Sequence, residues 1–153
     1  MKAKPSPLQL KNFQVLQMEY KCVFPNVENP VPASKLFDKY QIEVDFIWKK
    51  QKESTWIVMT KIEINKVAKP LSGYSIFIEG ISFFKIAPNL EKKEHDNLLK
   101  FSATGIALQC LRDSVKNITA HGPFGKLILP TFDLNYLVSE KLKSIEAKKK
   151  ISS

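Results

Sequence analysis

The sequence predicts an α+β protein, in which a four-stranded antiparallel sheet precedes a long helix and a shorter C-terminal helix. Two observations predict this fold class. Apolar residues recur at every second position in four segments between residues 16 and 86, as they do in strands. From about residue 94 the spacing changes to 3.6, the period of an α-helix. Strands followed by helices are typical of folds whose helices are segregated from the sheet.

The first two expected strands are separated by a long connection. The first strand has one core face, formed by Leu16, Met18, Tyr20, Cys22 and Phe24. Residues 25–40 carry Pro25, Pro30 and Pro32 and form the connection, which we expect to wrap the surface or to act as a binding loop. The second strand has charged residues on one face and, on the other, Ile42, Val44, Phe46 and Trp48.

The third and fourth strands differ in their outward faces. The third points Trp56, Val58, Ile62 and Ile64 inward, and we expect its outward residues to be Lys61, Glu63 and Asn65. The fourth runs from Tyr74 to Ile86 and is apolar on both faces, with Phe77, Ile81 and Phe83 around Glu79 on one of them. A strand that is apolar on both faces is usually covered on both sides. Because the chain has few helices, this pattern predicts burial by oligomerisation.

Two helices complete the fold. From about Glu94 to Ile118 one helical stripe contains Phe101, Thr104, Leu108, Leu111, Val115 and Ile118. A flank of small residues beside it would let a second helix or a sheet approach closely, and we assign an oligomer interface to Ala103, Ala107 and Ser114. The segment 122–130 forms a turn and a short extended piece. Thr131 or Asp133 then caps the last helix.

The charge is strongly basic and comes from lysine. Lys and Arg total 24 against 15 acidic residues, which gives a net charge of +9, yet Arg112 is the single arginine. Arginine is the residue that best recognises phosphates and guanine edges, so this excess disfavours a nucleic-acid-binding module. No apolar run approaches the roughly 18 residues of a membrane helix, and we expect no membrane insertion and a cytoplasmic location.

Catalytic motifs are absent from the sequence. It has no phosphate-binding glycine loop, no zinc-protease motif and no nucleophile elbow. Cys22 and Cys110 lack metal-site spacing, and the two histidines, His95 and His121, are far apart. We therefore expect neither an enzyme nor a cofactor or metal ion.

The segment from Arg112 to Pro130 resembles the SecB family of bacterial protein-export chaperones. The similarity lies in a basic–acidic pair late in the long helix, a Gly-x-Phe turn and an L-x-L segment before a proline: Arg112-Asp113, Gly122-Pro123-Phe124 and Leu127-Ile128-Leu129-Pro130. The last helix opens with Phe132-Asp133, as in that family. The resemblance covers residues 8–145 as one domain. It leaves 1–7 as a flexible N-terminal segment and 146–153 as a basic disordered tail.

This resemblance implies an ATP-independent holdase that assembles as a dimer of dimers. Its clients would be unfolded polypeptides, bound in grooves between the long connection, the second strand and the last helix. The implied client-binding residues are Val27, Val31, Leu36, Phe37, Ile42, Val44, Phe46, Trp48, Leu134, Leu137 and Leu142.

The resemblance leaves the biological role open between two alternatives. Phe77 and Glu79 match the position at which the family docks the motor SecA, but Tyr20, Lys21 and Cys22 replace its companion acids on the first strand. The chain is therefore either a holdase for export or a dedicated chaperone of an antitoxin in a toxin–antitoxin pair. A Lys-rich nucleic-acid-binding module is a third reading, from a different class.

Overall fold

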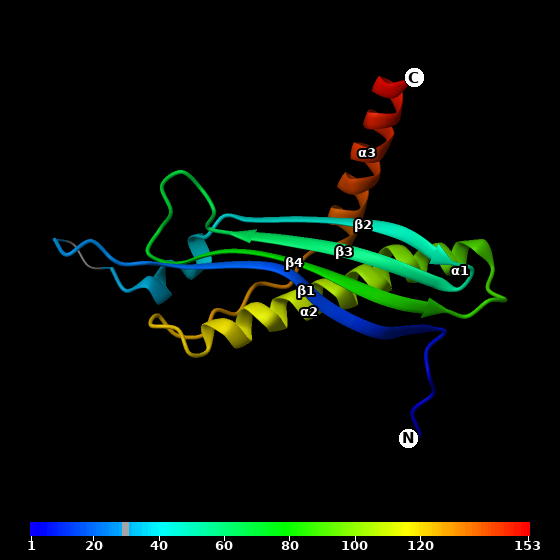
Figure 1. Ribbon diagram of the computed structural model, residues 1–153, viewed down its shortest axis with the longest axis horizontal. Coiled ribbons are helices and arrows are strands. Elements are labelled where there is room, and N and C mark those ends of the chain that lie inside the picture. The colour runs from blue at the N-terminus through cyan, green and yellow to red at the C-terminus, as the bar shows by residue number, and fades with distance from the viewer. Residues whose placement is uncertain (29–30) are drawn as a thin grey trace.

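The strands predicted from the sequence form one antiparallel sheet in the computed structural model, which describes residues 1–28 and 31–153 (Figure 1). In spatial order the strands are β1 (Leu8–Val23), β4 (Gly73–Ile86), β3 (Thr55–Ile64) and β2 (Ile42–Lys52). The predicted α+β class is confirmed. Strand β1 begins eight residues earlier than the alternating pattern suggested, and Pro30 of the predicted connection lies outside the described residues.

The long helix runs along one face of this sheet and contains an irregular turn. It comprises α1 (Lys92–Asn97), a π-helical segment (Leu98–Ala103) and α2 (Thr104–Thr119), which follow one another without a break. Helix α3 (Leu134–Ser152) begins after Asp133, whose carboxylate accepts a hydrogen bond from the Tyr136 amide at 3.1 Å. Of the two predicted caps, Asp133 is therefore the one used.

The main core lies between the sheet and α2. Ile62 and Ile64 of β3 and Ile76 and Ile78 of β4 pack against the helical stripe Leu108, Leu111 and Val115. Gly80 of β4 allows this close contact, because a Cβ atom there would lie 2.9 Å from the Leu111 side chain. The stripe predicted from the 3.6-residue period is thus the face that α2 buries.

The small flank of the long helix packs on the sheet of the same chain. Ala103 and Ala107 are fully buried in a cluster with Val58 and Phe84. The prediction that these two alanines form an oligomer interface is wrong, because the sheet already covers them. Ser114 is half-buried, and its hydroxyl donates to the Cys110 carbonyl oxygen at 2.9 Å.

Asn65 directly follows the last residue of β3 and is buried, not outward-facing as predicted. Its backbone has a φ of 52°, in the left-handed region that asparagine tolerates better than most residues. Its side-chain amide donates to the carbonyl oxygens of Leu71 and Tyr74, both at 2.8 Å, and its oxygen accepts from the Leu71 amide. Asn65 therefore holds the turn between β3 and β4 from inside.

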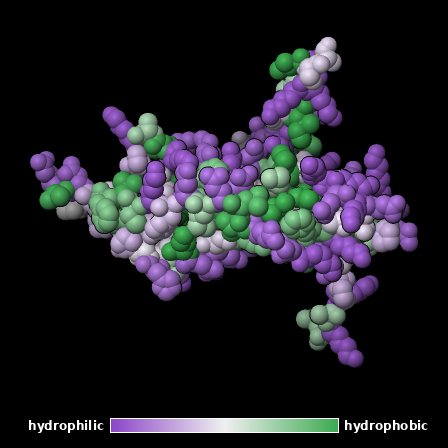
Figure 2. All heavy atoms as spheres, in the orientation of Figure 1, coloured by the Kyte–Doolittle hydropathy of each residue, from purple (hydrophilic) through white to green (hydrophobic). Residues whose placement is uncertain are grey.

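The other face of the sheet, hereafter the outer face, has no helix on it in the part of the chain described (Figure 1). Phe83 and Ile81 of β4 lie opposite Ile57 and Met59 of β3 on this face. Figure 2 shows hydrophobic residues across the middle of the molecule and hydrophilic residues at the end that carries α1 and the β2–β3 turn. Within residues 1–28 and 31–153, no element supplies the predicted second cover for β4.

The C-terminal segment is helical. We predicted that residues 146–153 would be disordered, but α3 continues to Ser152, and its last turns project away from the sheet (Figure 1). Lysine and alanine are good helix formers, so this segment continues the helix without packing. Residues 1–7 are exposed and outside regular structure, and no helix described is long and apolar enough to cross a membrane.

Candidate functional site

An apolar groove lies where the long connection meets the segment between α2 and α3. We call it the crossover groove. Its volume is about 250 Å³, and its lining comes from the connection, the start of β2 and the extended segment: Phe37, Asp38, Tyr40, Ile42, Leu127, Ile128, Leu129 and Pro130. Seven of these eight residues are apolar or aromatic, so the groove suits apolar side chains of a ligand.

The connection forms one wall of the groove and is fixed by Tyr40. Two short 3₁₀ helices, Ala33–Lys35 and Phe37–Lys39, lead into this buried tyrosine. The Tyr40 hydroxyl donates to the Ser72 carbonyl oxygen at 2.8 Å and accepts from the Tyr74 amide at 2.9 Å. Burial raises the pKa of Tyr40, which keeps the donating proton in place.

The opposite wall depends on the Gly-x-Phe turn. The Tyr74 hydroxyl donates to the Gly125 carbonyl oxygen at 2.8 Å and accepts from the Phe124 amide at 3.1 Å. Gly122 passes so close that a Cβ atom there would clash with this hydroxyl. The turn therefore has a glycine because the backbone must approach a buried tyrosine.

Two further hydrogen bonds align the extended segment that follows the turn. The Thr119 hydroxyl oxygen accepts from the Leu127 amide at 2.9 Å, and the Arg112 guanidinium donates to the Leu129 carbonyl oxygen at 2.8 Å. Leu127 and Leu129 are buried by this arrangement, whereas Ile128 is 68% exposed. Ile128 thus presents an apolar side chain to solvent at the edge of the groove.

Of the eleven predicted client-binding residues, Phe37 and Ile42 line the crossover groove. Leu36 and Val44 are half-buried and pack against the main core beneath it. Val27 and Val31 are exposed and do not line the groove. The predicted site is thus only partly gathered in one place.

Phe46 and Trp48 belong to the packing of β2 on the long helix. Phe46 is buried, with its ring centroid 5.3 Å from that of Trp48. The Trp48 indole N–H donates to the hydroxyl of the fully buried Thr104 at 2.9 Å. Their assignment to the groove is corrected, because their partners are residues of the same chain.

The three predicted residues of α3 also lie outside the crossover groove. Leu134 and Leu137 pack against the main core, and Leu142 lines a different pocket. The helix is tied to β2 by an ion pair between Lys141 and Asp45, with an N–O distance of 2.7 Å. Partial burial of Asp45 opposes its charge, but the hydrogen bonds from Lys141 and the Phe46 amide and the positive charges of Lys141 and Lys61 together outweigh this and lower the Asp45 pKa.

Sequence reasoning missed most of one wall. Leu127, Ile128, Leu129 and Pro130 were recognised as a motif but not as groove residues, and Tyr40 was not singled out. The signal present in the sequence is the short apolar run Leu127-Ile128-Leu129 before Pro130, but all three residues are apolar, and only the structure shows that Ile128 is the exposed one.

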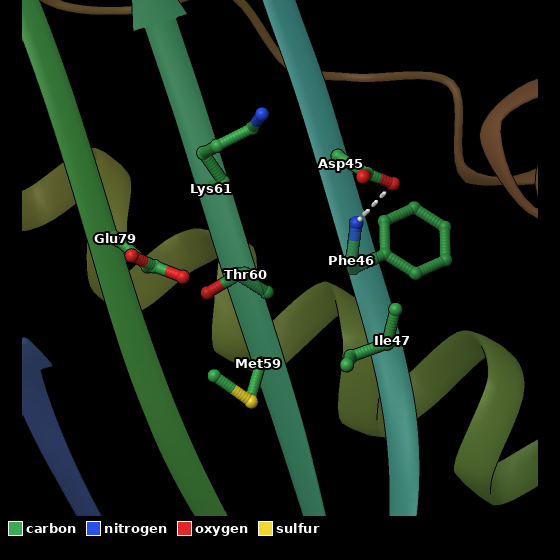
Figure 3. Close-up of a pocket in the computed structure, with 7 residues that line it drawn as sticks. All are labelled: Asp45, Phe46, Ile47, Met59, Thr60, Lys61 and Glu79. Atoms are coloured by element: carbon green, nitrogen blue, oxygen red, sulfur yellow. Dashed lines mark hydrogen bonds between the residues drawn. The ribbon is translucent and has the colours of Figure 1, made fainter.

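Phe77 and Glu79 lie on the outer face of β4, in half-buried positions. Glu79 lies opposite Lys61 of β3, which in turn lies opposite Asp45 of β2, and all three line a small hollow (Figure 3). The Lys66 ammonium lies 4.7 Å from the centre of the Phe77 ring. Lysines are therefore interspersed with the acids of this face.

Comparison with known proteins identifies the fold. Among solved structures, a SecB-like chaperone of Mycobacterium tuberculosis, solved in complex with a ChAD peptide from the HigA1 antitoxin, aligns with a TM-score of 0.55 and 12% identity. The alignment covers 82% of this chain and 90% of that chain. A protein of unknown function from Streptococcus agalactiae aligns over 82% of this chain and 97% of its own, with 14% identity and a TM-score of 0.48. The first similarity shows that the chain has a SecB-like fold.

No protein-family model matches the sequence, and no curated protein matches it. The similarity to the SecB-like chaperone is therefore one of fold.

Proposed function

We propose that the chain is an ATP-independent holdase chaperone that binds unfolded segments of polypeptide in the crossover groove. The observation that carries this proposal is the groove itself, whose apolar walls are fixed by hydrogen bonds of the buried residues Tyr40 and Tyr74. An unfolded client offers apolar side chains in no fixed order. A fixed apolar groove with an exposed edge binds such a ligand by area rather than by pattern.

For the client, we favour a dedicated antitoxin over exported preproteins. Two observations support this choice: the M. tuberculosis fold neighbour holds an antitoxin peptide, and Lys61 and Lys66 lie among the acids of the outer face near Glu79. A family export member would use an acidic outer face for the basic tail of SecA. Added lysines weaken such an attraction.

Holdase activity is tested by the light scattering of an unrelated unfolded protein diluted into buffer. The chain should suppress aggregation at a severalfold excess, equally well with and without ATP. A chain that binds neither this client nor a disordered antitoxin tail would refute the proposal. For the alternative of a nucleic-acid-binding module, affinity for DNA would have to fall steeply with salt concentration.

We also propose that the protein assembles as a homotetramer, a dimer of dimers. Strand β1 lies at an edge of the sheet over its full 16 residues, and it carries the exposed side chains of Leu10, Val15 and Leu16. A long edge strand with exposed apolar side chains favours pairing with a second copy. Light scattering coupled to size-exclusion chromatography should give the mass of four chains, and a mass of 17.5 kDa would contradict the assembly.

A further inference from the structure

A second and larger pocket lies between the first turns of the long helix and α3. We call it the α1–α3 pocket. It has a volume of about 540 Å³ and shares no residue with the crossover groove. Its apolar floor is formed by Phe101, Val138 and Leu142. Its basic rim is formed by Lys92, Lys93 and Lys100.

The lysines of the rim are available to pair with a ligand. In residues 1–28 and 31–153, none of these three lysines makes an ion pair, and Asp96 is the one acidic residue of the lining. The end of the molecule that carries α1 is correspondingly hydrophilic in Figure 2. An apolar floor beneath unpaired lysines is complementary to a ligand with apolar and negatively charged groups side by side.

The pocket coincides with the irregular turn of the long helix. Lys100 and Phe101 belong to the π-helical segment Leu98–Ala103. Such segments are rare, and they occur frequently at functional sites. A π turn also changes the direction in which successive side chains project, and here two of its side chains line the same pocket.

An adjoining hollow of about 380 Å³ extends this surface. It shares Lys93, Asn97 and Phe101 with the pocket and adds the carboxylates of Glu91 and Glu94. A rim with an amide and both signs of charge suits a polypeptide, with its backbone hydrogen-bonding groups and varied side chains, better than the uniform chain of a lipid.

We propose that the α1–α3 pocket binds an acidic amphipathic segment of a polypeptide client. An apolar side chain of the segment would contact Phe101, Val138 and Leu142, while its Asp or Glu side chains would pair with Lys92, Lys93 and Lys100. The inference rests on the proposed holdase function and deepens it, because it names the class of client.

The test compares two triple variants of the full chain that change its net charge equally. One is Lys92→Glu/Lys93→Glu/Lys100→Glu, and the matched control on the projecting end of α3 is Lys148→Glu/Lys149→Glu/Lys150→Glu. The probe is a fluorescent Glu-rich peptide with leucines at helical spacing, measured by anisotropy. The pocket variant should bind it about tenfold more weakly than the wild type, and the control variant within about twofold.

Equal losses in both variants would overturn the proposal, because they would reflect net charge alone. A wild type that binds laurate but not the peptide would also overturn the proposal. A changed molar mass of the pocket variant would overturn it too, because it would make the pocket an interface between copies. Thermal unfolding verifies that both variants fold. A wild type that suppresses aggregation but does not bind the acidic peptide refutes this inference alone, whereas a wild type that binds no unfolded chain refutes the proposed function.

Discussion

Gly73→Ala should lower the free energy of unfolding by about 3 kcal/mol. Gly73 has a φ of 114°, which disfavours any residue with a Cβ atom, and that atom would also overlap the Tyr40 hydroxyl oxygen. The strained backbone costs about 1–2 kcal/mol, and the two hydrogen bonds of the Tyr40 hydroxyl each contribute about 1 kcal/mol. Urea unfolding measures the loss, and weakened client binding should accompany it because Tyr40 lines the groove.

Gly125→Ala is the matched control for this prediction. Gly125 also has a positive φ, of 85°, but nothing lies within 4 Å of the position that its Cβ atom would occupy. It should therefore show only the backbone cost of about 1–2 kcal/mol. If the two variants lose equal stability, the steric role assigned to Tyr40 is wrong.

Trp48→Ala should lower the free energy of unfolding by about 3 kcal/mol and leave client affinity unchanged in the folded protein. The substitution removes a ring that packs against Phe46 and leaves the buried Thr104 hydroxyl without its donor. Trp48→Phe, which keeps an aromatic ring, should cost about 1 kcal/mol for the lost hydrogen bond. Chemical unfolding and client titration of both variants measure the two effects.

A Trp48→Ala variant with normal stability and weakened client binding would mean that Trp48 belongs to the binding site. The resemblance to the SecB family implied that Trp48 binds clients, in which case its truncation would weaken client binding and cost little stability. A variant of normal stability that binds client about tenfold more weakly would support that placement and contradict the packing described here.

The elements of the fold could be predicted because their patterns are local. Ile42, Val44 and Phe46 alternate with charged residues, and Leu108, Leu111 and Val115 recur at helical spacing, so each pattern indicates both an element and its buried face. The local sequence does not determine which other element, or which other chain, packs against that buried face. The small flank of Ala103 and Ala107 would suit a second copy as well as the chain's own sheet, and only the three-dimensional arrangement decides between them.

The site could be predicted only in part for the same reason. The long connection and the start of β2 were recognised, and Phe37 and Ile42 do line the groove. The second wall depends on the hydroxyl of Tyr74, which reaches Phe124 and Gly125 about fifty residues later in the chain. No spacing in the sequence shows that contact, so Leu127–Pro130 could be recognised as a motif without its position being known.

The central claim is that an unfolded client binds in the crossover groove, and Ile128→Asp tests it most directly. Ile128 lines the groove and is 68% exposed, so its replacement should change the free energy of unfolding by no more than about 0.5 kcal/mol. Ile47→Asp is the control, since Ile47 is 45% exposed and lies on the outer face next to Met59.

The measurement is the affinity of each variant for one fluorescently labelled, permanently unfolded client. Ile128→Asp should weaken binding about tenfold, because an aspartate replaces an exposed apolar contact at the edge of the groove, and Ile47→Asp should stay within about twofold of the wild type. Normal binding by Ile128→Asp, or an equal loss in both variants, would contradict the assignment of the client to this groove.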